Sequence, residues 1–330
     1  MIEKIFENFK KYTILVIGDV MIDAYWTGSV NRISPESPVP VLEIKSRDYR
    51  LGGAANVALN LQSLGATPIL CSIIGKDNHE NLFFDLLKKN NLTSDAIFSS
   101  PQRTTTMKYR MIANHSQLLR VDEENRQEIG IEEQQQLFNK IEKLITTRSV
   151  DAIIFEDYDK GLLNKELIAK IIDLAKKNKI IVTVDPKRKN FHHYQGVTLF
   201  KPNLKELKEG FNQETDFSNL QALQEAIKEF AEKMNFDFLL TTLSEKGVTV
   251  YDRKEDKSYH HNAYLRQIAD VSGAGDTVIA VSTLLLIEQI PISQIAAIAN
   301  LAGGIVCEYA GVVPIKKEEL KQQILKNKLI

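Results

Sequence analysis

The sequence contains only two cysteines and no apolar stretch long enough to cross a membrane. Cys71 and Cys307 lack the spacing of a metal or redox pair, which favours two small core residues over a disulfide. The longest apolar runs, near 278–287 and 295–306, are shorter than the roughly 20 residues that span a bilayer and are typical of core helices. Residues 1–12 lack the apolar stretch and cleavage site of a secretory signal. We therefore expect a cytoplasmic protein that does not act in a membrane.

The sequence also lacks an excess of charge of either sign. Lys and Arg number 42 against 43 Asp and Glu, so the net charge of -1 predicts no binding to nucleic acid. The P-loop motif is absent, because Gly75-Lys76 has neither the upstream glycine nor the following hydroxyl residue. The G-x-G-x-x-G motif of dinucleotide-binding enzymes is absent after the first strand. What is present, 43% hydrophobic and 26% charged residues among 330, is typical of a globular chain with a large core.

One glycine-containing stretch offers a site for an anion. Gly273, Ala274 and Gly275 permit a tight turn that brings successive backbone N–H groups together, and the apolar run 278–287 predicts a buried helix directly after them. The N-terminus of a helix carries partial positive charge and favours an anion such as a phosphoryl group. Asp276 would lie beside that anion, where its carboxylate can accept a proton from an attacking hydroxyl. The alternative is that Asp276 only caps the helix and the glycines only shape a loop.

The rest of the chain alternates between apolar strands and amphipathic helices. This alternation predicts a parallel sheet with helices on both faces, and ligands of such sheets bind beyond the carboxyl ends of the strands. The first strand, 14–17, ends at Gly18-Asp19, which places Asp23 close to that edge. The further elements are expected at 68–74, 78–89, 131–145, 152–155, 165–176, 180–184 and 238–242. We find no linker between them, so we expect one domain over residues 1–330.

Two segments, about 24–50 and 102–122, predict a small exposed sheet inserted in the main domain. Prolines exclude a helix in the first segment, and the second alternates in character from residue to residue. One face would carry Thr106, Lys108 and Arg110, and the other Met107, Tyr109 and Met111. The apolar face needs cover, either from the main domain or from a second copy of the sheet. We expect the second copy, and therefore a homodimer through this sheet.

Two motifs resemble the signatures of the ribokinase-like (PfkB) carbohydrate kinases. The stretch 270–276 is similar to their C-terminal signature, and Gly52-Gly53-Ala54-Ala55-Asn56 to their N-terminal glycine motif. Residues 18–23, 32–41 and 117–122 further resemble the heptose 7-phosphate kinases of this family. The resemblance covers almost the whole chain. It implies a ribokinase-like three-layer α/β/α fold with a central, mostly parallel sheet and a small inserted β lid.

The resemblance also implies roles for individual residues at the sugar end of the site. Asp23, Gly52, Gly53 and Asn56 correspond to positions that hold the sugar, and Lys187 matches the heptose kinase pattern. Asp276 corresponds to the catalytic base, and the amides of Gly273, Ala274 and Gly275 to the group that stabilises the transferring oxygens. We add Lys108, Arg110 and Arg120 from the small sheet as cations for a phosphate on the sugar. The alternative for these three is a solvated lid surface.

For the nucleotide the resemblance implies ATP with Mg²⁺. Asn203-Leu204-Lys205-Glu206 resembles the Asn-x-x-Glu motif, in which the glutamate organises Mg²⁺ through water. A helix-capping Asn203 with Glu206 at the third position is the alternative. Thr242, Ser244 and Gly247 correspond to a loop beneath the nucleotide. Asn300 corresponds to a position near the adenine, although a core asparagine with satisfied hydrogen bonds explains it equally well.

The leading hypothesis is an ATP-dependent kinase of D-glycero-D-manno-heptose 7-phosphate. The attacked group would be the anomeric hydroxyl, and the 1,7-bisphosphate would serve ADP-heptose and lipopolysaccharide core synthesis. The alternatives are a kinase for another sugar or sugar phosphate, and a non-catalytic sugar-phosphate-binding protein. Retention of Asp276 with the complete glycine loop argues against the second alternative. The bifunctional heptose enzymes carry a nucleotidyl-transferring domain after the kinase, whereas this chain ends at Ile330, so we expect a stand-alone kinase with a separate adenylyltransferase.

Overall fold

The main body of the protein contains a nine-stranded sheet with the strand order β13-β12-β11-β10-β9-β8-β1-β4-β5. The computed structural model describes residues 2–114, 116–211, 217–264 and 266–330. The seven strands from β11 to β5 in this order run parallel to one another. β12 is antiparallel to β11, and β13 is antiparallel to β12. The strands are β1 (Thr13–Gly18), β4 (Thr67–Gly75), β5 (Ala96–Ser100), β8 (Ala152–Glu156), β9 (Ile181–Asp185), β10 (Leu199–Phe200), β11 (Phe238–Thr242), β12 (Val248–Asp252) and β13 (Lys257–His261).

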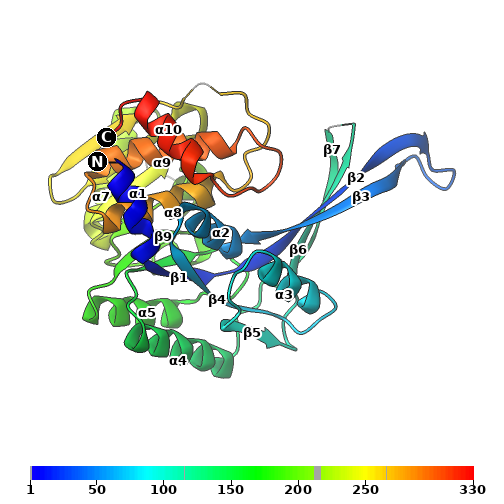
Figure 1. Ribbon diagram of the computed structural model, residues 1–330, viewed down its shortest axis with the longest axis horizontal. Coiled ribbons are helices and arrows are strands. Elements are labelled where there is room, and N and C mark those ends of the chain that lie inside the picture. The colour runs from blue at the N-terminus through cyan, green and yellow to red at the C-terminus, as the bar shows by residue number, and fades with distance from the viewer. Residues whose placement is uncertain (1, 115, 212–216, 265) are drawn as a thin grey trace.

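Helices cover both faces of this sheet, as the alternation of the sequence predicts. Ile14 and Val16 of β1 face one apolar core and Leu15 and Ile17 face the other. The first core is closed by α1 (Ile2–Asn8), α2 (Ala54–Leu64), α3 (Glu80–Lys89), α8 (Ala274–Ile287), α9 (Ile292–Val306) and α10 (Lys317–Lys326). The second is closed by α4 (Ile131–Thr147), α5 (Lys165–Lys177), α6 (Leu204–Gly210) and α7 (Leu220–Met234). Figure 1 shows α4 and α5 on the side of the sheet opposite to α2, α8 and α9. This is the expected three-layer α/β/α arrangement.

Short 3₁₀ turns and two edge strands complete the main body. The 3₁₀ turns are Phe9–Lys11, Arg188–Asn190 and Ser244–Lys246. The sequence did not predict β5 and β13, which form the two edges of the sheet. An edge strand has one neighbour and tolerates polar side chains, so it lacks the continuous apolar run of a central strand. No helix of the described segments is both long and apolar enough to cross a membrane.

A second sheet, the lid sheet, extends from the main body as a long arm (Figure 1). Its strands are β2 (Val20–Ile33), β3 (Pro40–Gly53), β6 (Thr106–Ala113) and β7 (Ser116–Glu123), in the order β3-β2-β6-β7. β2 and β6 run parallel, whereas the two outer pairs are antiparallel. Because only one residue separates β1 from β2, the lid sheet begins directly at the carboxyl edge of the main sheet.

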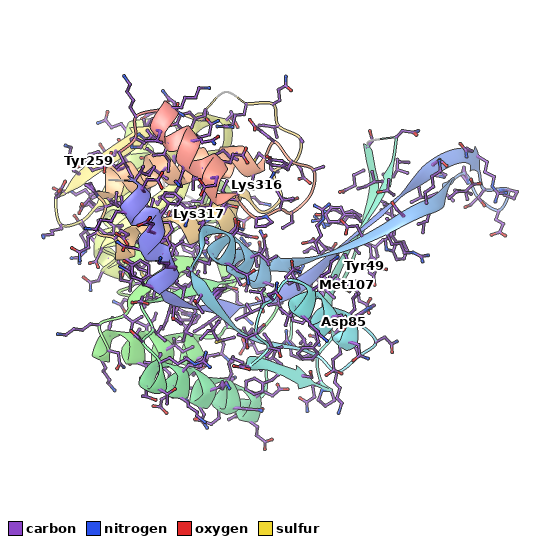
Figure 2. All side chains as sticks on the ribbon, in the orientation of Figure 1. Tyr49, Asp85, Met107, Tyr259, Lys316 and Lys317 are labelled. Carbon is purple, nitrogen blue, oxygen red and sulfur yellow. The ribbon has the colours of Figure 1, made fainter. Side chains whose placement is uncertain are left out.

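The lid sheet has the two predicted faces, but the main body covers part of the apolar one. Met107 is completely buried in the first core, at the base of the lid sheet (Figure 2), so the expectation that it is exposed is wrong. The reason is that β6 starts beside the first residues of β2, where Thr106 pairs with Met21 close to the main sheet. Farther out, Leu119 and Val121 of β7 remain exposed to 57% and 44%, opposite Met111 and Tyr109. The exposed apolar part therefore lies on the outer half of the arm.

Candidate active site

The candidate site is built around Asp276 in the first turn of α8. Every residue from Asp276 to Leu286 is buried, so this helix runs through the core and holds the carboxylate at a fixed position. Asn56 Nδ2 donates to Asp276 Oδ2 at 2.7 Å, and the Tyr158 hydroxyl donates to Asp276 Oδ1 at 2.9 Å. Asn56 belongs to the N-terminal glycine motif and Asp276 to the C-terminal one. The fold thus brings the two predicted motifs into direct contact across 220 positions of sequence.

Glycines are required where the chain passes close to this carboxylate. Gly273 adopts a left-handed conformation with φ of 82°, and a Cβ atom there would lie 2.8 Å from Asn56 Nδ2. A Cβ at Gly52 would lie 2.1 Å from Asp23 Oδ2. A larger residue at either position would displace a side chain predicted to contact the sugar. Gly273 is the N-cap of α8, so the first turn of the helix begins beside Asp276, although the Ala274 N–H donates to the Val271 carbonyl at 3.4 Å.

The environment of Asp276 shifts the pKa of its carboxyl. Burial, with a smaller contribution from the nearby Asp185 carboxylate, raises the pKa of this carboxyl to about 6. The hydrogen bonds from Asn56 and Tyr158 act in the opposite direction, because they stabilise the ionised form. A base with a pKa just below neutrality is ionised at pH 7 and still accepts a proton effectively.

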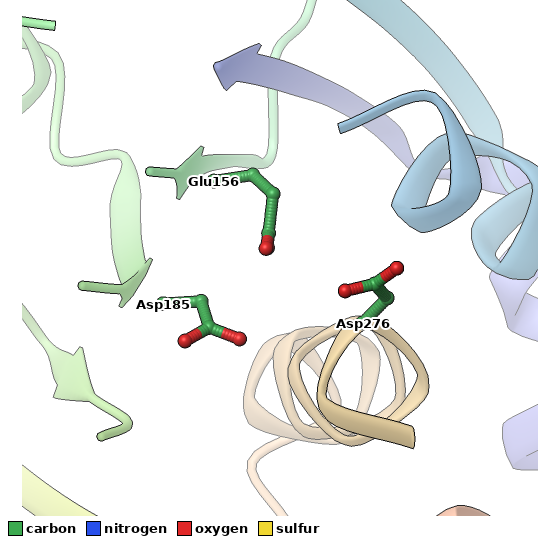
Figure 3. Close-up of side chains that lie close together, drawn as sticks. All are labelled: Glu156, Asp185 and Asp276. Atoms are coloured by element: carbon green, nitrogen blue, oxygen red, sulfur yellow. The ribbon is translucent and has the colours of Figure 1, made fainter. Parts of the chain in front are cut away.

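Two further carboxylates meet Asp276 at the ends of adjacent strands. Glu156 is the last residue of β8 and Asp185 the last of β9, and the two are register partners in the parallel pair. One oxygen of each lies within 4.8 Å of the others and of Asp276, and all three side chains are buried. Figure 3 shows the three carboxylates converging from two strands and the helix. Burial and the neighbouring carboxylates raise the pKa of Glu156 well above its usual value.

The sequence did not single out Glu156, or Lys201, which is buried and lies 2.7 Å from Asp185. A usable signal was present, since Lys201 directly follows β10 and Glu156 ends β8. A charged residue at the carboxyl end of a buried strand lies at the edge where ligands bind. The sequence assigns no role to Tyr158 either. Its hydrogen bond to Asp276 depends on a loop conformation that residue types alone do not determine.

The predicted nucleotide residues Asn203 and Thr242 lie farther along the same carboxyl edge of the main sheet, after β10 and at the end of β11. Asn203 and Glu206 form a reciprocal capping box, with Asn203 Oδ1 accepting from Glu206 N at 2.9 Å and Glu206 Oε2 accepting from Asn203 N at 2.8 Å. Lys187 forms an ion pair with the other Glu206 oxygen, so it lies beside the predicted nucleotide residues. Thr242 pairs with Asn203 through a β-bridge. The capping alternative for Asn203 and Glu206 is therefore present in the structure, and the Mg²⁺ role stays a prediction.

The three remaining nucleotide candidates lie at the turn after β11 and on α9. Ser244 begins the exposed 3₁₀ turn after β11, and Gly247 closes that turn with a positive φ of 86°. Asn300 is partly buried on α9 and donates a hydrogen bond to the Asn262 carbonyl at 2.9 Å. Asn300 is not among the buried residues of α9, so it is not the core asparagine of the alternative, although its Nδ2 group has an acceptor. A role near the adenine remains a prediction for Asn300.

The three predicted lid cations each have a carboxylate partner. Arg110 is buried and forms an ion pair with Asp23, the residue predicted to hold the sugar hydroxyls. Lys108 lies 3.2 Å from Asp122, and Arg120 lies 2.9 Å from the same carboxylate. The sequence predicts that Lys108 and Arg110 share one face of the lid sheet, but it does not predict that the cations pair with carboxylates of the same chain. A phosphate would have to compete with these carboxylates.

A family model for the pfkB family of carbohydrate kinases matches residues 11–318. The chain belongs to this family. Its relatives include the bifunctional protein HldE of Methylobacillus flagellatus, 41% identical over 311 residues that cover 94% of this chain and 63% of the relative. HldE of Helicobacter pylori strain G27 is 36% identical, with 93% of this chain and 65% of the relative covered. The chain thus spans just under two thirds of the length of the first curated relatives that it matches.

Solved structures show the same fold at low sequence identity. Phosphofructokinase-2 from Escherichia coli, in complex with substrates and products, superimposes with a TM-score of 0.77 at 18% identity and covers 96% of this chain and 98% of its own. Ribokinase of Arabidopsis thaliana, complexed with ribose and ATP, gives a TM-score of 0.70 at 15% identity, with 96% and 98% covered. The ribokinase-like fold predicted from the sequence is confirmed by these similarities.

Proposed function

We propose that this chain is a Mg²⁺- and ATP-dependent kinase that phosphorylates the anomeric hydroxyl of a heptose 7-phosphate. The observation that carries the proposal is the position of Asp276, which two hydrogen-bond donors orient at the glycine-led N-terminus of α8. Family membership supports phosphoryl transfer to a sugar. The choice of a heptose rests on segments 32–41 and 117–122 and is supported by the HldE relatives.

In the proposed reaction, the steps are assigned to this chain's own residues. Asp276 takes the proton from the sugar hydroxyl as the oxygen attacks the γ-phosphorus and the bond from that phosphorus to the β-phosphate oxygen breaks. The N–H groups of Gly273, Ala274 and Gly275 hold the transferring oxygens through hydrogen bonds and the helix dipole. Because Asn56 and Tyr158 fix the carboxylate, little reorganisation is needed when the proton moves.

A divalent cation fits the residues present near Asp276. The acidic oxygens of Glu156 and Asp185, with Glu206 farther along the edge, are the hard donors that Mg²⁺ prefers. Bound there, Mg²⁺ would supply charge neutralisation for the phosphates. The resident cations Lys187 and Lys201 limit the negative charge of this edge before ATP binds.

The proposed activity also bears on the compartment, the oligomeric state and the partner enzyme of this kinase. ATP and sugar phosphates are cytoplasmic metabolites, which makes the cytoplasm the expected compartment. The exposed apolar residues Leu119 and Val121 support a homodimer in which the outer faces of two lid sheets meet. A separate adenylyltransferase would act on the product of the pathway.

The test is a mass-spectrometric measurement of ATP consumption over a panel of free and phosphorylated sugars. We expect turnover with the heptose 7-phosphate and a preference of at least tenfold in kcat/KM over the same heptose without its phosphate. Asp276→Asn serves as the background control. Equal efficiency on both sugars would remove the phosphate recognition, and a preference for another sugar phosphate would remove only the heptose. No turnover with any sugar would favour a binding protein.

A further inference from the structure

The loop segment Ala310-Gly311-Val312, between α9 and α10, is held by side chains of the lid sheet. Arg50 Nη1 donates to the Ala310 carbonyl at 3.1 Å and to the Val312 carbonyl at 3.2 Å. The Val312 N–H donates to the Tyr25 hydroxyl at 3.0 Å. Because Tyr25 lies on β2 and Arg50 on β3, the lid sheet holds one side of this segment.

The other side of the segment is bonded to the turn that leads into α8. We call this turn, residues 270–273, the glycine turn. The Gly311 N–H donates to Asp270 Oδ2 at 3.0 Å, and Asp270 Oδ1 accepts from the Ser272 N–H at 2.9 Å. Ser272 directly precedes Gly273, the N-cap of α8. One carboxylate therefore connects the segment 310–312 to the start of the helix that carries the proposed base.

The fit between this segment and the two lid side chains is close. Gly311 has a positive φ of 74°, and a Cβ atom there would lie 2.8 Å from Tyr25 Cζ and 2.9 Å from Arg50 Nη1. Only glycine allows this approach. The Arg50 guanidinium also lies 4.8 Å from the centre of the Tyr25 ring, a distance typical of a cation–π contact. The two lid side chains thus support each other as well as the segment.

The same two lid residues border the predicted sugar contacts. Arg50 is the register partner of Asp23 across β2 and β3. The Arg110 guanidinium, which is paired with Asp23, lies 5.2 Å from the centre of the Tyr25 ring. A continuous set of contacts therefore runs from the predicted sugar residues through Tyr25 and Arg50 to the segment 310–312, and from there to the glycine turn.

We propose that Arg50 and Tyr25 are positioning residues for the glycine turn. They hold the segment 310–312, and this segment holds the Asp270 side chain that shapes the turn. A buried backbone N–H or C=O group that loses its partner must find another one. Removal of either lid contact should therefore let the segment move and release Asp270. The inference rests on the proposed function only where it concerns turnover, because that function assigns the transferring oxygens to the end of this turn.

The backbone just before the glycine turn has a separate anchor. The N–H groups of Ala269 and Asp270 donate to the Cys307 carbonyl at 2.8 and 3.2 Å. Neither of these two bonds involves the lid sheet. Loss of the lid contacts should therefore loosen the turn at Ser272 and leave Ala269 held as in the wild type.

Hydrogen–deuterium exchange of the full chain without substrates tests this positioning, read at single amides by electron-transfer fragmentation. We expect the Ser272 amide to exchange about tenfold faster in Tyr25→Phe and in Arg50→Gln, the effect of losing one hydrogen bond. The Ala269 amide and the amides of residues 278–287 should exchange as in the wild type, which also checks that the variants are folded.

Arg47→Gln is the matched control for Arg50→Gln. Arg47 is exposed on the same strand, and its guanidinium lies 5.2 Å from the centre of the Trp26 ring. Its replacement should leave exchange at Ser272 unchanged. An unchanged Ser272 rate in both Tyr25→Phe and Arg50→Gln would overturn the inference. Equal acceleration throughout residues 278–287 would also overturn it, since that result means a general loosening of the fold.

Steady-state kinetics provide a second readout that a purely structural role would not produce. Tyr25→Phe should lower kcat about tenfold and leave the KM of the sugar phosphate within about twofold of the wild type, because the turn acts on the transferring group. Faster exchange at Ser272 together with a wild-type kcat would overturn the role in catalysis. A wild type that turns over no sugar would remove the proposed function, whereas the exchange experiment would still decide the positioning.

Discussion

The floor of the candidate site and the lid sheet above it hold charged side chains in contrasting ways. On the floor, Glu156, Asp185 and Asp276 are buried at the ends of two central strands and one core helix. On the lid, all eight residues of β7 are exposed, and Arg120 meets Asp122 at the surface. Surface ion pairs contribute about 0 to 1 kcal/mol, whereas breaking a buried pair costs about 3 to 5 kcal/mol. We infer that the floor determines the chemistry and the lid determines which sugar binds and how the chains assemble.

The largest effect should come from the floor, with Asp276→Asn. This change keeps the shape of the side chain and removes the base, so we expect kcat to fall by roughly 10² to 10⁴. Binding of ATP, measured by calorimetry, should persist because its predicted contacts lie elsewhere. Near-normal turnover at saturating substrates would show that another group takes the proton.

The outer face of the lid should affect assembly and leave the chemistry intact. Replacing both Leu119 and Val121 by Ser removes two apolar side chains, each contributing roughly 1.5 to 3 kcal/mol when buried in an interface. We expect the dimer dissociation constant to rise about a hundredfold or more in sedimentation velocity. Ile131→Ser is the control, because this residue is 86% exposed on α4 and lies outside the lid. A wild type that is monomeric at micromolar concentration would rule out the lid dimer.

The inner face of the lid should affect recognition of the phosphorylated sugar. We expect Lys108→Ala and Arg110→Ala each to lower kcat/KM for the heptose 7-phosphate about ten- to a hundredfold, the value of one charge-assisted hydrogen bond. Arg110→Ala also leaves Asp23 without its partner, so it should be the more damaging of the two. Lys45→Ala, an exposed lid lysine, is the control. If both variants lose the same activity on the heptose without its phosphate, these cations do not read the phosphate.

The same contrast explains what could be predicted from the sequence. The central strands and α8 are continuous apolar runs, and burial on both faces requires such runs. The two family motifs predicted that Asn56 and Asp276 serve one site, but not the hydrogen bond between them. The burial of Met107 did not follow, because alternation defines the two faces of a strand but not the neighbour that covers each.

Charge pairs formed between distant segments were the least predictable feature. Arg110 with Asp23 and Lys201 with Asp185 depend on strand register and topology, which residue types leave open. The convergence of Glu156 with Asp185 likewise arises because the two end adjacent strands at the same register. Local patterns predicted most of the elements except the edge strands, and only the arrangement of the elements in space defines the electrostatics of the floor.

The smallest expected effect concerns the pH dependence of turnover, which tests whether the hydrogen bond from Tyr158 sets the pKa of Asp276. Burial raises the pKa of Asp276 to about 6, so the carboxylate is the active form above that pH and is progressively lost below it. We expect kcat/KM to fall about tenfold per pH unit on the acid side, measured with full metal loading at each pH.

The hydrogen bond from Tyr158 lowers the pKa of Asp276, so Tyr158→Phe should move the acid limb of the pH profile to higher pH. At pH 8 the variant should remain within about threefold of the wild type, since the base is then ionised in both. Tyr12→Phe, whose hydroxyl donates to the distant Glu288, is the matched control and should leave the limb unchanged. An acid limb at the same pH in Tyr158→Phe and in the wild type would mean that the base of the reaction is not the carboxylate that Tyr158 contacts.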